Sequence, residues 1–261
     1  MQATKYRSTG PPSRSVFYWL PGWKAVAPKL LIPWGMTLLR EIQLLLERTY
    51  GPTGVNLEKF LLTPSRNRTL SEMAGTSAAQ ISDLGRVFLR VANENLRLGI
   101  HYDSSVVEAL EERNPAYGLN DDNILPFMVF IEELDHAVHA ALKFREGVRD
   151  IHNETFVRDL ELQAKVDTYL ILQKYCAFFN NPPQVTDADR RWLRACVFDH
   201  DTGAFEDPRL ARRYRETNRL ARRYAGHLDR LSPKRRTAEI RHFRKLAYNQ
   251  KRDRIAALRP H

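Results

Sequence analysis

Residues 130–142 (FIEELDHAVHAAL) contain three carboxylates and two imidazoles within eight positions of an otherwise apolar stretch. Imidazole and carboxylate groups bind divalent cations, and the same groups transfer protons in acid–base catalysis. Two chemistries therefore fit this pattern, a metal site and a metal-free acid–base site. A solvated polar face, or a buried polar network that only holds helices together, gives the same pattern without chemistry.

The stretch lies within a predicted helix at 126–146, where successive residues are rotated by about 100° around the axis. Glu133 and His136 share one side of this helix with apolar residues, which predicts that both are buried. Asp135 and His139 fall on a neighbouring, more polar side. Because a buried carboxylate without a partner is costly, Glu133 must be protonated, paired or bound to a cation.

Glu133 and His136 form a Glu-x-x-His unit, whose spacing lets both side chains point toward one ion from the same helix. The unit resembles half of the motif of ferritin-like di-iron carboxylate proteins, in which two such units meet inside a four-helix bundle. The resemblance covers these four residues and the helical setting, and it does not extend to membership of that family. We therefore expect a divalent metal ion, zinc, iron or manganese, at Glu133 and His136.

A second predicted helix, at 155–178, adds an aspartate to this site. If it forms an antiparallel hairpin with the helix at 126–146, His136 lies level with Asp167. An aspartate beside a buried imidazole either orients the ring or binds the ion directly. Asp167 is therefore predicted to be a ligand or an orienting partner.

Two further glutamates complete the predicted site. Glu161 lies near the start of the helix at 155–178 and is a weaker candidate ligand. Glu132 is expected to be unpaired, and its position beside the ligands suits a general base if the protein is an enzyme. The pattern thus favours a metal-dependent hydrolase or oxidoreductase, without discriminating between the two reactions.

The basic residues are concentrated at the C-terminal end. From residue 208 onward the chain has 18 Lys and Arg against 4 Asp and Glu, although its overall net charge is only +10. The hexapeptide RLARRY occurs at 209–214 and again at 219–224. We expect its arginines to bind a polyanion, either nucleic acid without sequence preference or an acidic protein surface. Of the six arginines in the two copies, the predicted binding residues are Arg212, Arg213, Arg222 and Arg223.

This basic segment supports an alternative function, in which the protein is no enzyme and binds nucleic acid or a partner through its C-terminal helices. A weaker alternative is attraction to an anionic membrane surface. If the segment is a separate surface, its deletion leaves the metal site intact. If its arginines instead pair with the slightly acidic remainder of the chain, deletion unfolds the protein.

Most of the sequence segments that must position these residues show the spacing of apolar residues that is typical of helices. No useful β-alternation is visible, so the sequence predicts an all-α fold, a bundle-like single domain. One helix ends at Gly51 and another runs through both RLARRY copies; the rest are expected at 77–100, 104–113, 126–146, 155–178 and about 237–258. The predicted parts are a Pro- and aromatic-rich N-terminal arm at 1–32, a helical core at 33–207 and basic C-terminal helices at 208–261.

Cysteine and hydropathy patterns indicate the compartment. Cys176 and Cys196 lack a metal-binding spacing and are expected to be buried free thiols. A helix that crosses a bilayer needs about 20 apolar residues, and no apolar stretch of this sequence approaches that length. Pro21 interrupts the apolar patch near the N-terminus. We therefore expect a cytoplasmic protein without a transmembrane segment.

Overall fold

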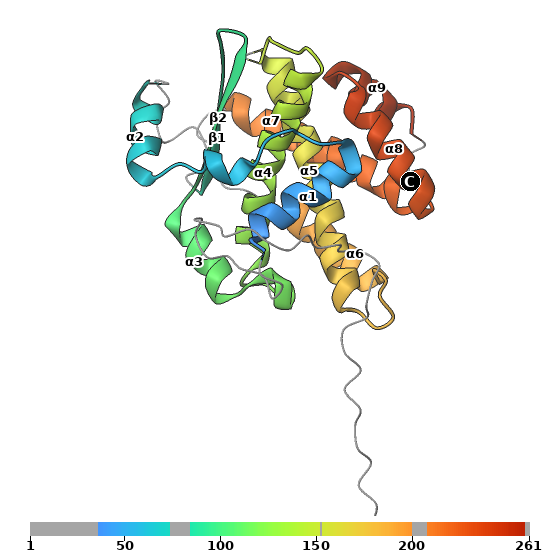
Figure 1. The fold of residues 1–261 in the computed structure, drawn as a ribbon. Coiled ribbons are helices and arrows are strands. Elements are labelled where there is room, and N and C mark those ends of the chain that lie inside the picture. Colours follow the sequence, from blue (N-terminus) through green and yellow to red (C-terminus); the bar gives the residue numbers. More distant parts are fainter. Residues whose placement is uncertain (1–35, 74–83, 152, 200–207, 259–261) are drawn as a thin grey trace, which may run out of the picture.

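The computed structural model describes residues 36–73, 84–151, 153–199 and 208–258. Within these ranges the fold is mostly helical and includes one small two-stranded sheet (Figure 1). The predicted N-terminal arm at 1–32 lies outside the described residues. The expected helical fold is therefore confirmed. The expectation that the protein contains no strands is wrong, because the described residues include this sheet.

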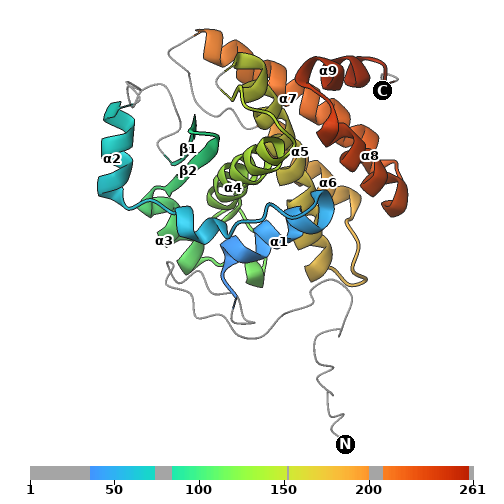
Figure 2. The same ribbon diagram turned by 45° about the horizontal axis from the view of Figure 1, so that its top comes forward.

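A hairpin of two long helices forms the centre of the fold. α4 (Ile124–Arg145) and α5 (Glu154–Phe179) pack side by side, joined by a short connection. Figures 1 and 2 show α1 (Leu38–Tyr50) lying across this hairpin, while α7 (Pro208–Asp229) packs on α5. α4 is buried on nearly every side, in agreement with its central place.

Local sequence signals set the ends of these helices. Gly51 ends α1 with a φ of +114°, a conformation that favours glycine. The side chain of Asn153 accepts a hydrogen bond from the backbone amide of Phe156 at 2.7 Å and so caps the start of α5. α5 ends just before Asn181 and Pro182, as the sequence predicts. Both long helices begin and end within two residues of their predicted bounds.

A β-hairpin stands where a helix was predicted at 77–100, so that prediction is wrong. β1 (Gly85–Ala92) pairs antiparallel with β2 (Asn95–Tyr102) along its whole length. The two connecting residues, Asn93 and Glu94, have φ angles of +50° and +58°. Two consecutive positive φ angles are typical of the tight turn that matches the twist of hairpin strands.

The hairpin packs on α4 and is stabilised there. The Tyr102 ring stacks on the Phe130 ring with centroids 4.7 Å apart, and its hydroxyl donates to the Phe130 carbonyl oxygen at 3.0 Å. Gly85 lies so close to α4 that a Cβ atom would stand 2.7 Å from Glu133 Cγ. The segment 87–91 (VFLRV) consists largely of strand-forming residues, and its apolar spacing fits a strand as well as a helix.

The described C-terminal part contains α7, α8 (Pro233–Lys245) and α9 (Tyr248–Ala256). As predicted, α7 carries both copies of the RLARRY repeat. The single helix predicted at about 237–258 is wrong, because the backbone is extended at Ala247 between α8 and α9. The Gln250 side chain accepts a hydrogen bond from the Ala247 amide at 2.9 Å and so starts a new helix.

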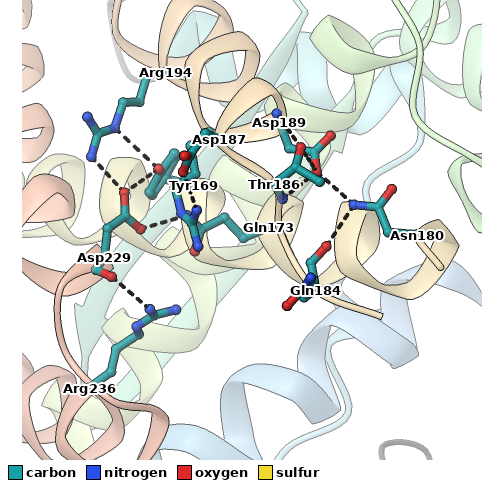
Figure 3. Close-up of polar contacts among 11 residues, drawn as sticks. Tyr169, Gln173, Asn180, Gln184, Thr186, Asp187, Asp189, Arg194, Asp229 and Arg236 are labelled. Atoms are coloured by element: carbon teal, nitrogen blue, oxygen red, sulfur yellow. Dashed lines mark hydrogen bonds and ion pairs between the residues drawn. The ribbon is translucent and has the colours of Figure 1, made fainter. Parts of the chain in front are cut away.

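A polar junction attaches α7 to α5 and to α6 (Asp187–Arg194). Asp229, at the end of α7, accepts three side-chain hydrogen bonds of 2.7 Å (Figure 3). The donors are the hydroxyl of Tyr169, the amide of Gln173 and the guanidinium of Arg194. The junction therefore connects the basic C-terminal helices to the centre of the fold.

The remaining described elements are short. They are 3-10 turns at Leu57–Phe60 and Pro115–Tyr117, α2 (Pro64–Met73), α3 (Ser104–Glu112) and a π-helical turn at Ala195–Asp199. α3 confirms the helix predicted at 104–113. Within the described ranges, no helix combines the length and the apolar character that a bilayer crossing requires.

Candidate metal centre

Three buried side chains converge between α4 and α5. Asp135 and His139 stand one turn apart on α4, and Asp167 lies in the middle of α5. His139 Nε2 is 3.2 Å from Asp135 Oδ1 and 3.0 Å from Asp167 Oδ2. The exposed fractions of Asp135, His139 and Asp167 are 0%, 1% and 3%. Such a group of carboxylate and imidazole side chains has the composition of a metal site.

The spacing of the three donor atoms suits a metal ion. All three lie within 4.8 Å of one another. Ligand atoms about 2.1 Å from one ion stand about 3–3.5 Å apart, and both distances from the imidazole nitrogen to the carboxylates fall in this range. The two carboxylates also balance the charge of a divalent cation, which lowers the cost of burying that cation.

Asp135 has the least satisfied carboxylate of the group. Neither of its oxygens has a well-aligned hydrogen-bond donor among the described residues, although the carboxylate is fully buried. His139 Nδ1 is also buried without such a partner in the described part of the chain. Leaving a buried acceptor without a donor costs about 1–3 kcal/mol, and more for a charged group. A cation bound by Asp135 would offset this cost for its carboxylate.

Without an ion, the charges of the cluster favour a protonated imidazole. Burial lowers the pKa of His139, but Asp135 and then Asp167 outweigh this effect and raise the pKa to about 9. Burial raises the pKa of Asp135 to about 6, against the opposing effect of the His139 charge. A buried ion-pair network is therefore the alternative to a metal site, and a metal ion would displace the proton from His139 Nε2.

Side chains from α1 and α5 hold Asp167 in place. The Tyr50 hydroxyl donates to Asp167 Oδ1 at 2.5 Å, and the Gln163 amide donates to Asp167 Oδ2 at 3.0 Å. The Tyr50 ring also meets the His139 ring edge-on, with centroids 4.9 Å apart. Burial and the Asp167 charge raise the pKa of Tyr50 well above its usual range, so the phenol remains a donor. Such outer partners orient the ligands of metal sites.

A chain of buried polar contacts continues from Gln163 to α9. Lys251 Nζ donates to Gln163 Oε1 at 2.7 Å and pairs with Asp159 Oδ1 at 2.9 Å. Lys143 Nζ pairs with the other oxygen of Asp159 at 2.8 Å. Through Gln163, the position of Asp167 is therefore coupled to the docking of the C-terminal helix α9.

The predicted hairpin register brings Asp167 close to an imidazole of α4, but that imidazole is His139 and not His136. His136 Nδ1 instead lies 3.6 Å from Glu133 Oε2, where the two side chains are 22% and 14% exposed. The predicted Glu-x-x-His unit thus stands apart from the buried cluster. The assignment of Glu133 and His136 as metal ligands stays a prediction.

The other two predicted glutamates take part in ion pairs. Glu132 Oε1 pairs with Lys165 Nζ at 2.6 Å, so it is not the unpaired carboxylate that we expected. Glu161 Oε1 pairs with Arg213 of α7 at 2.9 Å. The roles of Glu132 as a general base and of Glu161 as a ligand stay predictions.

A second Glu-x-x-His unit, Glu239 and His242 in α8, was overlooked in the sequence. The Glu239 carboxylate accepts hydrogen bonds from Arg254 at 2.7 Å and from the Tyr224 hydroxyl at 3.0 Å. His242 is exposed. Glu239 is therefore engaged in contacts within the C-terminal helices, away from Glu133 and His136.

Asp135 and His139 were missed because helix winding placed them on a polar side of α4. That side is in fact buried, since α4 has neighbours almost all round. A usable signal is the spacing of polar residues on both arms of the hairpin. Polar residues occur at every fourth position on both helices, three on α4 and three on α5, and the two sets are placed symmetrically about position 151 in the sequence. These six residues, termed the polar seam below, are Asp135, His139, Lys143, Asp159, Gln163 and Asp167.

The chain was compared with known protein families, curated proteins and solved structures. No family model matches the chain, and no match was found among curated proteins or solved structures.

The four arginines predicted to bind a polyanion differ in their contacts. Arg213 is held by the ion pair to α5 described above. Arg222 pairs with Asp199, and Arg223 donates to a backbone carbonyl at the end of α9 at 3.1 Å. Arg212 is exposed on α7. Part of the positive charge predicted for binding is thus used in contacts inside the fold.

Proposed function

We propose that the protein binds a divalent metal ion through Asp135, His139 and Asp167. The observation that supports this most is the approach of two buried carboxylates to one imidazole nitrogen, at 3.0 and 3.2 Å, with no aligned donor for Asp135 among the described residues. One imidazole and two carboxylates form a mixed donor set. Such a set suits manganese, iron or zinc better than calcium or magnesium, which prefer oxygen ligands.

The proposed ion has a catalytic rather than a structural role. Three protein ligands leave coordination positions open, which is typical of catalytic sites, whereas structural zinc sites are closed by four. Asp167, but neither Asp135 nor His139, also lines a pocket between α1, α5 and α8, and we propose this pocket as the route of a small molecule toward the ion. A metal ion here would polarise a substrate or activate water, in a hydrolase or an oxidoreductase.

Metal content tests the proposal. Wild-type protein incubated with zinc, iron or manganese and freed of excess ion should retain about one equivalent. Asp135→Asn keeps the shape of the side chain and should lose most of the metal, because the amide is a poor ligand. His136→Ala is the matched control and should retain it. Circular dichroism establishes that each variant is folded.

Two results would contradict this assignment. Metal content below about a tenth of an equivalent in the wild type would leave the cluster as a buried ion-pair network. Loss of metal in His136→Ala together with its retention in His139→Ala would instead assign ligation to the Glu133–His136 unit.

We propose polyanion binding as a second function, because one side of α7 presents a row of exposed arginines. They follow one another at steps of three or four residues, so their side chains lie on one side of the helix. A dense row of guanidinium groups binds phosphates through charge and not through base reading. Nucleic acid without sequence preference is the expected partner. The row consists of Arg212, Arg215, Arg219 and Arg222.

Fluorescence anisotropy with unrelated DNA and RNA oligomers at several salt concentrations tests this second function. The affinity should fall log-linearly with salt, and replacing Arg212, Arg215 and Arg219 by serine should weaken binding to both oligomers alike. The control replaces three exposed cations elsewhere by serine. Equal binding by the two triple variants, or none by the wild type at low salt, would reject the proposal. The control residues are Lys59, Arg90 and Arg97.

A further inference from the structure

We propose that the pocket between α1, α5 and α8 binds a small ligand with an apolar body and an anionic head, and that the substrate of the metal centre belongs to this class. The second half of this inference rests on the proposed metal function, and the first half does not. The pocket has a volume of about 280 Å³. It therefore suits a small molecule, since pockets for drug-sized ligands measure about 300–1,000 Å³.

One side of α5 forms a wall of the pocket. Asp167, Leu170, Ile171 and Lys174 all line it. Seven positions separate Asp167 from Lys174, which corresponds to about 10 Å along the helix axis. A ligand that lies along this wall meets a carboxylate at one end, an apolar middle and an amine at the other end.

The neighbouring helices extend the apolar middle. Leu45 and Leu46 of α1 and Ile240 of α8 line the pocket together with the α5 residues. Such walls bind a hydrocarbon body because they remove it from water. They offer few partners for a ligand that is polar along its whole length. The body of the ligand is therefore expected to be apolar.

Positive charge exceeds negative charge along the lining. Two cations, Lys174 and Arg236, line the pocket with one carboxylate, Asp167. Asp167 is engaged with Tyr50, and Arg236 donates to a backbone carbonyl at the end of α7 at 2.9 Å, so we assign the ligand's head to Lys174. Although the Lys174 side chain reaches solvent, surrounding protein atoms and then the Arg48 charge lower its pKa. A bound anion would counteract both effects. The pocket therefore selects an anionic head at its Lys174 end.

The opposite end of the pocket is a wall of the metal centre. Tyr50 and Asp167 line the pocket, and the same Asp167 carboxylate lies 3.0 Å from His139 Nε2. A ligand with its anionic head at Lys174 places its far end at Tyr50 and Asp167. The reacting group of the substrate is therefore expected about 10 Å from the anionic head.

Hexanoate is a probe with suitable length and charge, and 1-hexanol is its neutral counterpart. Calorimetric titration of the intact protein should show hexanoate binding, with 1-hexanol bound at least about tenfold more weakly. Lys174→Met removes the charge, keeps the bulk and should weaken hexanoate binding about tenfold. Ala177→Phe adds a ring to the lining and should abolish binding. Lys245→Met, at the exposed end of α8, is the matched control and should bind as the wild type does.

Metal content measured in the same samples separates this inference from the proposed metal function. Hexanoate binding by metal-free Asp135→Asn protein would support the pocket even if the metal function fails. Full metal occupancy without hexanoate binding would refute the pocket alone. Equal hexanoate affinity in the wild type, Lys174→Met and Ala177→Phe would also refute it, because binding would then lie elsewhere. Equal affinity for hexanoate and 1-hexanol would refute the anionic head.

Discussion

Glu41 is a buried carboxylate of α1 whose charge couples folding to pH. Burial raises its pKa from 4.5 to about 7, and the nearby Tyr175 hydroxyl opposes part of that rise. The unfolded chain loses this proton near pH 4.5, so the folded protein holds an extra proton between about pH 4.5 and 7. The stability contributed by this group is therefore present below pH 4.5 and is lost as pH rises toward 7.

We expect Glu41→Gln to be more stable than the wild type at pH 8 by about 1–3 kcal/mol, and about equally stable at pH 4. The amide cannot ionise and so avoids the cost of a buried charge. Urea unfolding at both pH values measures the difference, with Glu111→Gln on the exposed side of α3 as the control. A gain of the same size at both pH values would exclude the titration of Glu41 as its cause.

Tyr50 is the residue that most directly orients the proposed ligand Asp167. We expect Tyr50→Phe to weaken metal binding by about tenfold, because Asp167 loses its 2.5 Å hydrogen bond. The free energy of unfolding of the metal-free protein should fall by about 1 kcal/mol. Competition with a chelating dye measures the affinity, and Tyr117→Phe, at an exposed tyrosine, is the control. An unchanged affinity would show that Asp167 needs no partner from α1.

At the scale of elements, α9 is attached to the core through a buried amine. Lys251→Met keeps most of the apolar bulk but removes the contacts of the amine with Gln163 and Asp159. Breaking a buried pair costs about 3–5 kcal/mol, and Asp159 retains Lys143, so we expect a loss of about 3 kcal/mol. Urea unfolding compares this variant with Lys234→Met, at an exposed lysine of α8. A loss no larger than that of the control would show that packing alone holds α9.

The sequence predicted those helices whose ends carry strong local signals. Gly51 ends α1, Asn153 caps α5, and the prolines after α5 stop it. It failed at the hairpin, because Phe88 and Val91 have helical spacing while Val87, Leu89 and Val91 alternate as in a strand. Packing on α4 decides between the two, and a single sequence does not display that contact. The break at Ala247 was missed for a similar reason, since no proline or glycine marks it.

The candidate site was predictable in part. The antiparallel register placed Asp167 level with His136, and the imidazole that Asp167 contacts is His139, about one turn further along α4. The choice of His136 was wrong as a partner for Asp167, because the rule that polar sides face solvent does not apply to a helix that is buried on nearly every side. The contribution of Tyr50 depends on how α1 crosses the hairpin, which the sequence does not encode in a recognisable motif.

At the scale of the whole molecule, the C-terminal helices complete the core. Tyr224 of α7 and Phe243 of α8 are fully buried with stacked rings, and Lys251 of α9 reaches the polar seam. We therefore expect a chain that ends at residue 207 to lose cooperative unfolding and metal binding together. Thermal melts followed by circular dichroism test this. A truncated chain that melts cooperatively and keeps its metal would identify the tail as separable, which is one of the two outcomes foreseen from the sequence.

The polar seam has a consequence for how insertions are tolerated. The ion pairs between α4 and α5 oppose a shift of one helix along the other. A shift by one turn would place Lys143 opposite Gln163 in place of Asp159. Asp159 would then lose one of its cationic partners, which is costly for a buried carboxylate. The alignment of α4 with α5 therefore resides in the helices and not in the length of their connection. A residue gained in that connection would leave the alignment unchanged. One extra residue between Asp135 and Lys143 would rotate the part of α4 on one side of the insertion by about 100°. The polar-seam residues on that part would then turn away from their partners on α5.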